Sequence, residues 1–298
     1  MKHVADLLRA RRPDLEIRSL EPLGEGDFHR AYLLNARWVV RVPKHEQAAR
    51  ALASEACLLP RLAPLLTITV PVPALVTGEA GETLALHEYV RGAALTRELW
   101  HGMPEPERIR VAARLGAFLR ELHGLDTDLA RRCGLAPVDH GADMDRLQLR
   151  LADRPASLLP DFVRRGLERC FADSMAGAAA GYAPALLHAD VSPEHVRVDT
   201  DRLEITGVID WGDARIGDPA RDFIFLYEDW GGDFLEHALE AYDAGARDDL
   251  RSRVLRHYLA DQLEWTLTAA EQDRHRDVEH GVALLAAGLA DLHGPPGA

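Results

Sequence analysis

The spacing of apolar residues divides the chain into three stretches. A short run over Val4–Arg11 predicts a helix that ends before Pro13. Apolar residues then gather in short runs separated by glycine, proline and polar residues, which is typical of β-strands. One helix is expected among the strands, over Glu46–Leu62. The predicted strands cover Ile17–Leu23, Arg30–Leu34, Trp38–Val42, Ala74–Thr77 and Thr83–Tyr89.

From Thr96 onward the apolar residues recur at helical spacing. The clearest example is Glu105–His123, where they form one broad stripe. Strands followed by helices indicate an α+β fold, and a chain of 298 residues has room for two lobes with separate cores. The other long helices are predicted over Asp143–Leu151, Asp161–Ala180, Leu250–Ala269 and Val278–Leu292.

The stretch from Leu186 to Asp222 interrupts this helical half. Two apolar runs, Val196–Val198 and Ile205–Ile209, flank turn-prone residues, so a hairpin is predicted. Such a hairpin would bring two carboxylates and one imidazole close together at its open end. These are the side chains of Asp190, Asp210 and His195. A magnesium-dependent phosphate reaction needs such a set, because one group accepts a hydroxyl proton while the others hold the metal. The alternative is that these residues only cap turns.

Composition and charge narrow the class of protein. The three cysteines, Cys57, Cys133 and Cys170, form no C-x-x-C pair and no even set, which favours a reducing cytoplasm over a disulfide scaffold or a zinc site. We see neither a signal peptide nor a long apolar run, so we expect no membrane partner. The net charge of −13 argues against a nucleic-acid partner and is compatible with a cationic ligand.

Two segments around the hairpin, HADVSPEH and VIDWGDARIGDPARDF, resemble the catalytic and metal loops of protein kinases. They are more similar to the loops of antibiotic phosphotransferases, which read H-x-D-x-x-x-x-N or H and I-D-F/W-G-D. The match is nearest to aminoglycoside 2″-phosphotransferases and macrolide kinases. The resemblance implies a protein-kinase-like bilobal fold. Residues 1–90 would form a small, β-rich nucleotide lobe, and residues 91–298 a larger helical lobe, with a hinge near 87–92.

The resemblance also implies roles for the loop residues. Asp190 would act as base or orienter for the substrate hydroxyl, and His195 and Asp210 would hold Mg²⁺ against the phosphates of ATP or GTP. Asp222 would orient the catalytic loop through backbone hydrogen bonds. Ser192, inside the loop, is a further candidate for substrate contact.

The nucleotide would lie between a glycine-containing turn and the hinge. Gly24 and Gly26 precede a predicted strand pair, where glycines let the backbone approach a phosphate closely. Taken alone, such a pair is more often a plain hairpin turn. The segment Leu86–Gly92 resembles the linker between kinase lobes, and Tyr89 and Val90 would border the base.

One position departs from the family pattern. The lysine that grips phosphates in the family falls on Arg41 here, whereas Lys44 lies three residues further, past Pro43. An arginine can hold phosphates bidentately, but its guanidinium is bulkier than an ammonium. The site is therefore either functional through Arg41 or weakened. Glu55, on the predicted helix, is expected to pair with this cation, or else to be a solvated helix residue.

The substrate is expected to be a small molecule with a hydroxyl and positive charges. In the resembled enzymes the helical region supplies carboxylates for substrate ammonium groups, and the alternative is that these carboxylates are solvated helix faces. We therefore expect a monomeric kinase for an aminoglycoside-like compound. A macrolide or small-metabolite kinase, or a pseudokinase that only binds nucleotide, are the alternatives. The carboxylate candidates are Glu228, Asp229, Asp261 and Glu264.

Overall fold

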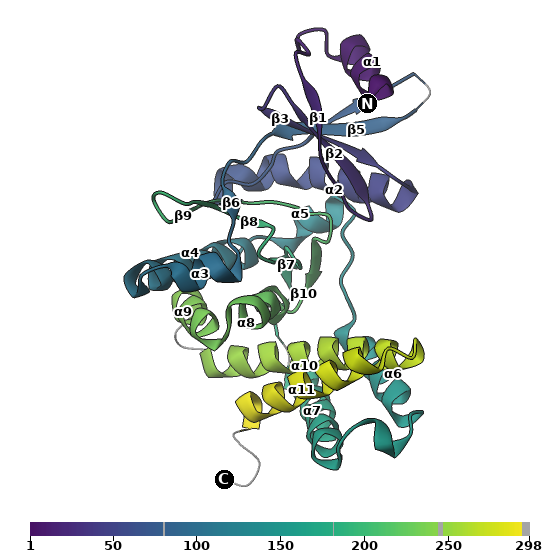
Figure 1. Ribbon diagram of the computed structural model, residues 1–298, viewed down its shortest axis with the longest axis vertical. Coiled ribbons are helices and arrows are strands. Elements are labelled where there is room, and N and C mark those ends of the chain that lie inside the picture. The colour runs from purple at the N-terminus through teal and green to yellow at the C-terminus, as the bar shows by residue number, and fades with distance from the viewer. Residues whose placement is uncertain (80, 181, 244–246, 294–298) are drawn as a thin grey trace.

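The computed structural model describes residues 1–79, 81–180, 182–243 and 247–293. Its first part holds a five-stranded antiparallel sheet in the order β1-β2-β3-β5-β4, preceded by helix α1 (Lys2–Arg11) (Figure 1). Helix α2 (Glu46–Leu62) connects β3 to the last two strands and is followed by the short helix η1 (Ala63–Leu65). The strands are β1 (Leu20–Glu25), β2 (His29–Leu34), β3 (Trp38–Pro43), β4 (Ala74–Thr77) and β5 (Thr83–Glu88).

The first strand begins three residues later than predicted. The side-chain oxygen of Asn35 accepts hydrogen bonds from the backbone N–H groups of Arg18 and Ser19, at 2.8 and 3.0 Å. A side chain therefore occupies the backbone donors that a neighbouring strand would otherwise use. The apolar spacing of this segment could not reveal that contact, because Asn35 lies sixteen residues further along the chain.

Two cores hold this part together. Helix α1 packs on the sheet through Val4, Leu7 and Leu8, which share a buried cluster with apolar residues of β2 to β5. Helix α2 lies beneath the sheet, between it and the helical part (Figure 1). Its residues Leu58, Leu59 and Leu62 belong to the large core of the helical part. Helix α2 is therefore shared by both halves of the molecule.

The second part is mainly helical, as predicted. Helix α4 packs closely along α9, and a Cβ atom at Gly116 of α4 would collide with the carbonyl group of Ala238. The glycine is therefore required for this close approach. The helices are α3 (Arg97–Gly102), α4 (Glu105–His123), α5 (Thr127–Arg132), α6 (His140–Ala152), η2 (Ala156–Leu158), α7 (Asp161–Ala180), η3 (Pro219–Phe223), α8 (Ile224–Trp230), α9 (Gly232–Asp243), α10 (Arg247–Glu271) and α11 (His275–His293).

The predicted hairpin is present between α7 and η3. Strands β8 (Val196–Asp199) and β9 (Glu204–Val208) pair antiparallel, and β6 (Ala93–Ala94) extends them to a three-stranded sheet. Strand β7 (Ala185–Leu187) precedes this hairpin in the chain and β10 (Arg215–Gly217) follows it. The two strands pair antiparallel with each other. The catalytic-loop and metal-loop segments, residues 188–195 and 209–214, are the connections between these two small sheets.

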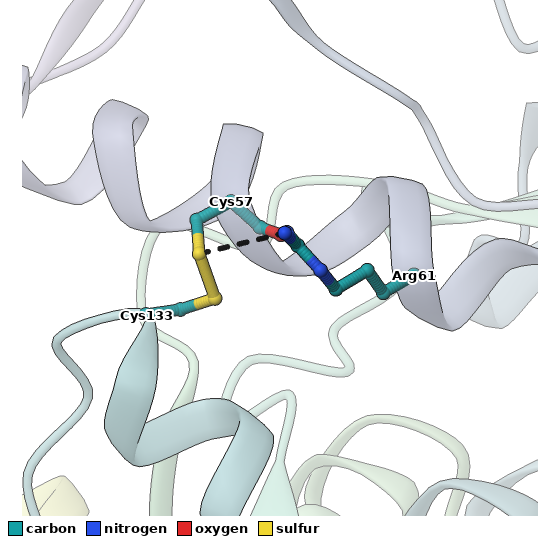
Figure 2. Close-up of a disulfide and its surroundings, with 3 residues drawn as sticks. All are labelled: Cys57, Arg61 and Cys133. Atoms are coloured by element: carbon teal, nitrogen blue, oxygen red, sulfur yellow. Dashed lines mark hydrogen bonds between the residues drawn. A yellow bond between two sulfur atoms is a disulfide. The ribbon is translucent and has the colours of Figure 1, made fainter.

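The sequence favoured reduced cysteines over disulfides, and this prediction was wrong for two of the three. Cys57 of α2 and Cys133 at the end of α5 form a disulfide, which joins the two parts of the molecule (Figure 2). The pair could not be recognised from spacing because 76 residues separate its members. Within the described residues, no helix combines the length and the hydrophobicity that crossing a membrane would require.

Candidate active site

A cavity of about 810 Å³ opens between the five-stranded sheet and the two loops of the helical part. Its volume lies in the range of small-molecule sites. The sheet contributes the β1–β2 turn, part of β3 and the end of β5, and the helical part contributes both loops. Eight residues singled out from the sequence line it: Gly24, Gly26, Arg41, Tyr89, Val90, Asp190, His195 and Asp210.

Arg41 projects from β3 into this cavity and is paired on both sides. Its Nη1 lies 2.5 Å from Glu55 Oε2, and its Nη2 lies 3.4 Å from Asp210 Oδ1. The residues opposite Arg41 on β2 and β5 are Ala31 and Ala85, whose small side chains leave room for the guanidinium. The side chains of Arg41 and Glu55 are only 9% and 2% exposed, so this ion pair is a buried, charge-assisted contact.

Lys44 makes different contacts. Its Nζ donates to the carbonyl oxygen of Gly26 at 3.0 Å and lies 2.8 Å from Glu25 Oε1. Lys44 therefore fastens the β1–β2 turn. A Cβ atom added at Gly24 or Gly26 would meet no protein atom within 4 Å. The protein itself leaves open space over both glycines, as the close approach of a ligand would require.

The catalytic-loop segment is held together by His195. Its Nδ1 lies 3.0 Å from the carbonyl oxygen of Asp190, 3.2 Å from Asp190 Oδ2 and 3.1 Å from Ser192 Oγ. Burial works against a charged ring, but the hydrogen bond and charge of Asp190 prevail and raise the pKa of His195 to about 9. Burial likewise opposes the charge of Asp190, and the bond from His195 outweighs it and lowers the pKa of Asp190. At neutral pH the two form an ion pair.

Asp210 lies between Arg41 and His195, with its Oδ2 3.7 Å from His195 Nε2. Its backbone φ is +61°, which is uncommon for a residue other than glycine and typical of strained functional loops. A carboxylate suits magnesium, whereas an imidazole suits softer metals better. Among the described residues, no three His, Cys, Asp or Glu side chains surround one point as a protein-only metal site would need. The Asp210 carboxylate therefore fits a magnesium ion that takes its other oxygens from phosphate and water, and the His195 imidazole is the poorer ligand of the two.

Asp222 anchors the catalytic loop from behind. Its Oδ1 accepts the N–H of Ala189 at 2.6 Å, and its Oδ2 accepts the N–H of His188 at 3.0 Å and His123 Nε2 at 2.9 Å. Burial would raise the pKa of Asp222, but these bonds lower it, His123 first among them. His123 in turn meets the Tyr242 hydroxyl at 3.0 Å through Nδ1. The predicted backbone hydrogen bonds of Asp222 are thus present.

His188 connects the two loops. Its Nδ1 accepts the N–H of Asp190 at 3.2 Å, and its Nε2 donates to the carbonyl oxygen of Ile209 at 3.0 Å. The N–H of Ile209 donates to the carbonyl oxygen of His195 at 2.9 Å. Ala189, between the two loop residues, also has a positive φ, of +68°. These contacts fix the position of Asp190 relative to Asp210.

Two of the acidic residues proposed for substrate binding lie near the catalytic loop. Glu228 accepts a hydrogen bond from Gln262 at 3.0 Å, and burial raises its pKa. Burial raises the pKa of Asp229 to about 6, helped by the negative charges of Glu228, Glu194 and Asp190. Asp229 thus lies within electrostatic range of Glu228, Glu194 and Asp190, and we refer to Glu194, Glu228 and Asp229 as the negative surface beside Asp190.

The other three substrate candidates have protein partners. Asp261 pairs with Arg221 at 2.9 Å, and Glu264 pairs with Arg150 at 3.3 Å. The Glu264 side chain is 64% exposed. Ser192 is buried and bonded to His195. A substrate would therefore compete with arginines for the first two residues.

The residues of the cavity wall that were not singled out from the sequence include two histidines and one glutamate. His29 Nδ1 lies 3.2 Å from Arg41 Nη2, and His87 Nδ1 donates to the carbonyl oxygen of Glu88 at 2.9 Å. Burial lowers the pKa of both rings to about 4, so both are neutral at pH 7. The glutamate is Glu194. Two-residue alternation from Arg41 along β2 and β5 would have found the histidines, once the strand register was known.

Comparison with known proteins agrees with this geometry. A family model described as the phosphotransferase enzyme family matches residues 19–256. The structure of the GDP and kanamycin complex of APH(2″)-IIIa is 28% identical, with a TM-score of 0.82 over 98% of this chain and 99% of that one. Macrolide 2′-phosphotransferase MphH from Brachybacterium faecium shares the fold, at 23% identity and a TM-score of 0.72 over 95% and 97% of the two chains.

A curated relative, the uncharacterized protein YcbJ of Bacillus subtilis (strain 168), is 26% identical over 226 residues, which is 70% of this chain and 69% of that protein. The family model covers most of the chain, including both loops and the sheet. The chain therefore belongs to the phosphotransferase enzyme family and has the kinase-like fold of its aminoglycoside phosphotransferases.

Proposed function

We propose that the protein transfers the γ-phosphate of ATP or GTP to a hydroxyl of a cationic, aminoglycoside-like small molecule. The observation that supports this most strongly is the row of charged groups on one cavity wall. Arg41 meets Asp210, Asp210 faces His195, and His195 meets Asp190, each within 4 Å. This row places a phosphate-binding cation, a metal-binding carboxylate and a hydroxyl acceptor in the order that phosphoryl transfer needs.

In this proposal the phosphates lie over Gly24 and Gly26 and contact Arg41, which Glu55 holds in place. Asp210 would bind magnesium, which would neutralise charge on the phosphates when bound. His195 Nε2 would join it only with the ring in its neutral form, because a protonated imidazole has no lone pair for a metal. Tyr89 and Val90, just past the end of β5, would border the base. Because phosphoryl transfer needs little covalent help from the protein, positioning by these groups would supply most of the rate.

Asp190 would receive the substrate hydroxyl. Its lowered pKa keeps it charged at neutral pH, so it can accept a hydrogen bond from the substrate hydroxyl until the proton is transferred. A lowered pKa also makes it a weak base, which suits a role in orienting the hydroxyl and taking its proton late. Asp222 and His188 support this role because they fix the backbone on both sides of Ala189.

The negative surface beside Asp190 supports a cationic substrate. Glu194, Glu228 and Asp229 would attract ammonium groups and turn a hydroxyl toward Asp190. The structural neighbour at 28% identity was determined with GDP and kanamycin. The arginine in place of lysine at position 41 favours one alternative, a pseudokinase that only binds nucleotide. A macrolide or small-metabolite kinase is the other alternative.

The test is a phosphorylation assay with magnesium and either ATP or GTP on a panel of amino-sugars, macrolides and small alcohols. We expect transfer to an amino-sugar, and a higher magnesium requirement for Asp210→Asn because one metal carboxylate is lost. Transfer to macrolides alone would exclude the cationic substrate. Nucleotide binding without transfer to any compound would favour the pseudokinase.

A further inference from the structure

The disulfide joins two segments that belong to different parts of the molecule. Cys57 lies on α2 beneath the sheet, and Cys133 ends α5 in the helical part (Figure 2). The two segments also lie close together at a second point, because a Cβ atom added at Gly134 would come into van der Waals contact with Ser54 Oγ, at 3.4 Å. The covalent bond therefore joins α2 and the end of α5 where the two already lie close together.

Helix α2 carries an active-site residue close to this bond. Glu55, two residues before Cys57, pairs with Arg41 at 2.5 Å. Leu58 and Leu59, immediately after Cys57, pack in the core of the helical part. A covalent tie at Cys57 consequently restricts how far Glu55 can move relative to the loops that carry Asp210.

A positive charge lies beside one of the two sulfur atoms. Arg61 Nη1 is 3.8 Å from Cys57 Sγ, and the same group donates to the Cys57 carbonyl oxygen (Figure 2). A guanidinium next to sulfur stabilises a thiolate. Cys57 is partly exposed, whereas Cys133 is 7% exposed. The surroundings of Cys57 are those of a cysteine that exchanges rather than of an inert structural one.

We propose that Cys57 and Cys133 form a reversible thiol–disulfide site that sets how firmly α2 presents Glu55 to Arg41. A dithiol reductant attacks one sulfur, the S–S bond breaks, and the other sulfur leaves as a thiolate. The second thiol of the reductant then resolves the mixed disulfide. The reductant becomes a cyclic disulfide, and the protein gains two electrons and two protons as two thiols. Arg61 stabilises Cys57 as the thiolate in both directions.

The disulfide form is the one in which the active-site residue Glu55 is held in position. With the bond intact, α2 is tied at Cys57 and Glu55 stays against Arg41. After reduction only non-covalent packing holds the helix, so we expect faster backbone hydrogen exchange over Glu46–Leu62. Reduction should also weaken the binding of magnesium nucleotide at least about fivefold, a typical size for coupling between two sites. This second expectation rests on the proposed function.

The first experiment compares oxidised and dithiothreitol-reduced wild type by hydrogen exchange and by nucleotide calorimetry. A Cys57→Ser/Cys133→Ser variant should show the exchange and affinity of reduced wild type, and dithiothreitol should not change them. In the matched control Cys170→Ser, dithiothreitol should change both as it does in wild type. Equal exchange over α2 in both wild-type forms would overturn the proposal. Nucleotide binding in neither form would instead refute the proposed function, and the exchange data would still decide the role of the disulfide.

The second experiment follows the free thiols by trapping and mass spectrometry across ratios of reduced to oxidised dithiothreitol. Arg61→Gln removes the charge that favours the thiolate, so half-reduction should need a ratio about two- to fivefold higher, the size of an exposed charge interaction. Arg50→Gln removes an arginine from the same helix, which pairs with Glu46, and should leave the ratio unchanged. An unchanged ratio in Arg61→Gln, or no disulfide in oxidised wild type, would contradict the proposal.

Discussion

Arg41 of the sheet and Asp210 of the metal loop meet across the cavity, with 3.4 Å between Nη2 and Oδ1. The contact joins residues 169 positions apart and links the two parts of the molecule at the place where phosphates are proposed to bind. Arg41 is also bonded to Glu55, so its guanidinium is already oriented toward the cavity. We propose that an arginine held in this way takes the place of the family lysine.

The first prediction concerns this cation. Arg41→Ala should weaken nucleotide binding at least about tenfold, because it removes the phosphate contact and leaves Glu55 buried without its partner. Arg41→Lys, which keeps a positive charge, should retain binding and should be used where the alanine variant is unstable. Calorimetry with ATP and GTP measures the effect. Lys44→Ala is the matched control and should change affinity less than about threefold, since its contacts are partly exposed. The reverse ranking would place the phosphates at the β1–β2 turn instead.

The second prediction concerns the chemical step. Asp190→Asn should lower kcat by about two orders of magnitude or more, the usual contribution of a positioned acid–base group. Nucleotide affinity should remain close to that of wild type, because Asp190 is not proposed to bind the phosphates. Steady-state kinetics and calorimetry check both. Asp199 lies at the end of β8 in the same hairpin, where its side chain accepts hydrogen bonds from the turn, and Asp199→Asn should leave kcat unchanged. Wild-type kcat in Asp190→Asn would remove this residue from the mechanism.

The third prediction concerns the anchor of the catalytic loop. Asp222→Ala removes the acceptor of two backbone N–H groups and of His123, and the Asp222 carboxylate itself is fully buried. It should cost about 2–4 kcal/mol in the free energy of unfolding and lower kcat as well. Tyr242→Phe removes only the bond to His123 and should cost about 1 kcal/mol. Urea denaturation measures both variants. An equal loss in the two would show that Asp222 has no special part in holding the loop.

The fourth prediction concerns pH. Burial lowers the pKa of His87 to about 4 from 6.5. The unfolded state therefore binds more protons between these values, and the free energy of unfolding rises with pH there. The contribution is fully present above pH 6.5 and is lost as the pH falls through 4, by at most about 3 kcal/mol. His87→Gln keeps a donor for the Glu88 carbonyl but cannot charge, so its stability should fall less between pH 6.5 and 4. An identical pH profile would show that His87 titrates normally.

The fifth prediction concerns the substrate. Replacing Glu228→Gln and Asp229→Asn together should raise the KM for an amino-sugar more than it changes kcat, and should weaken the salt dependence of binding. In wild type the affinity should fall below pH 6, because Asp229 becomes neutral below its pKa. Glu264→Gln tests how far the surface extends. Since Glu264 pairs with Arg150, we expect less than a twofold change. A dominant effect of Glu264 would move the substrate site along α10.

Elements with strong periodicity could be predicted from the sequence. The bounds of α2, α4 and α7 agree with the spacing of their apolar residues, because each buries one stripe. The hairpin could be predicted because turn-prone residues separate two apolar runs. Contacts between distant segments could not, since no local pattern encodes them. The Cys57–Cys133 bond and the bonds of Asn35 to residues 18 and 19 are of this kind.

The same distinction applies to the site. The loop motifs pointed to Asp190, His195 and Asp210 because they are short and local in sequence. His29 and His87 reach the cavity only through the pairing of β2 and β5 with β3, which the sequence does not state. His123 ends the helix predicted over Glu105–His123, and it is also the partner of Asp222. Its role depends on a residue 99 positions away.

The anchoring of the catalytic loop by Asp222 bears on how new specificities could arise. Asp222 is bonded to the loop backbone and to His123 of α4, whereas the acidic side chains proposed for substrate binding project from α8 and α10. Mutations on those helix surfaces could therefore accumulate without disturbing the groups that move phosphate. A laboratory library confined to the surfaces of α8 and α10 would be a practical starting point for redirecting the enzyme to other hydroxyl compounds.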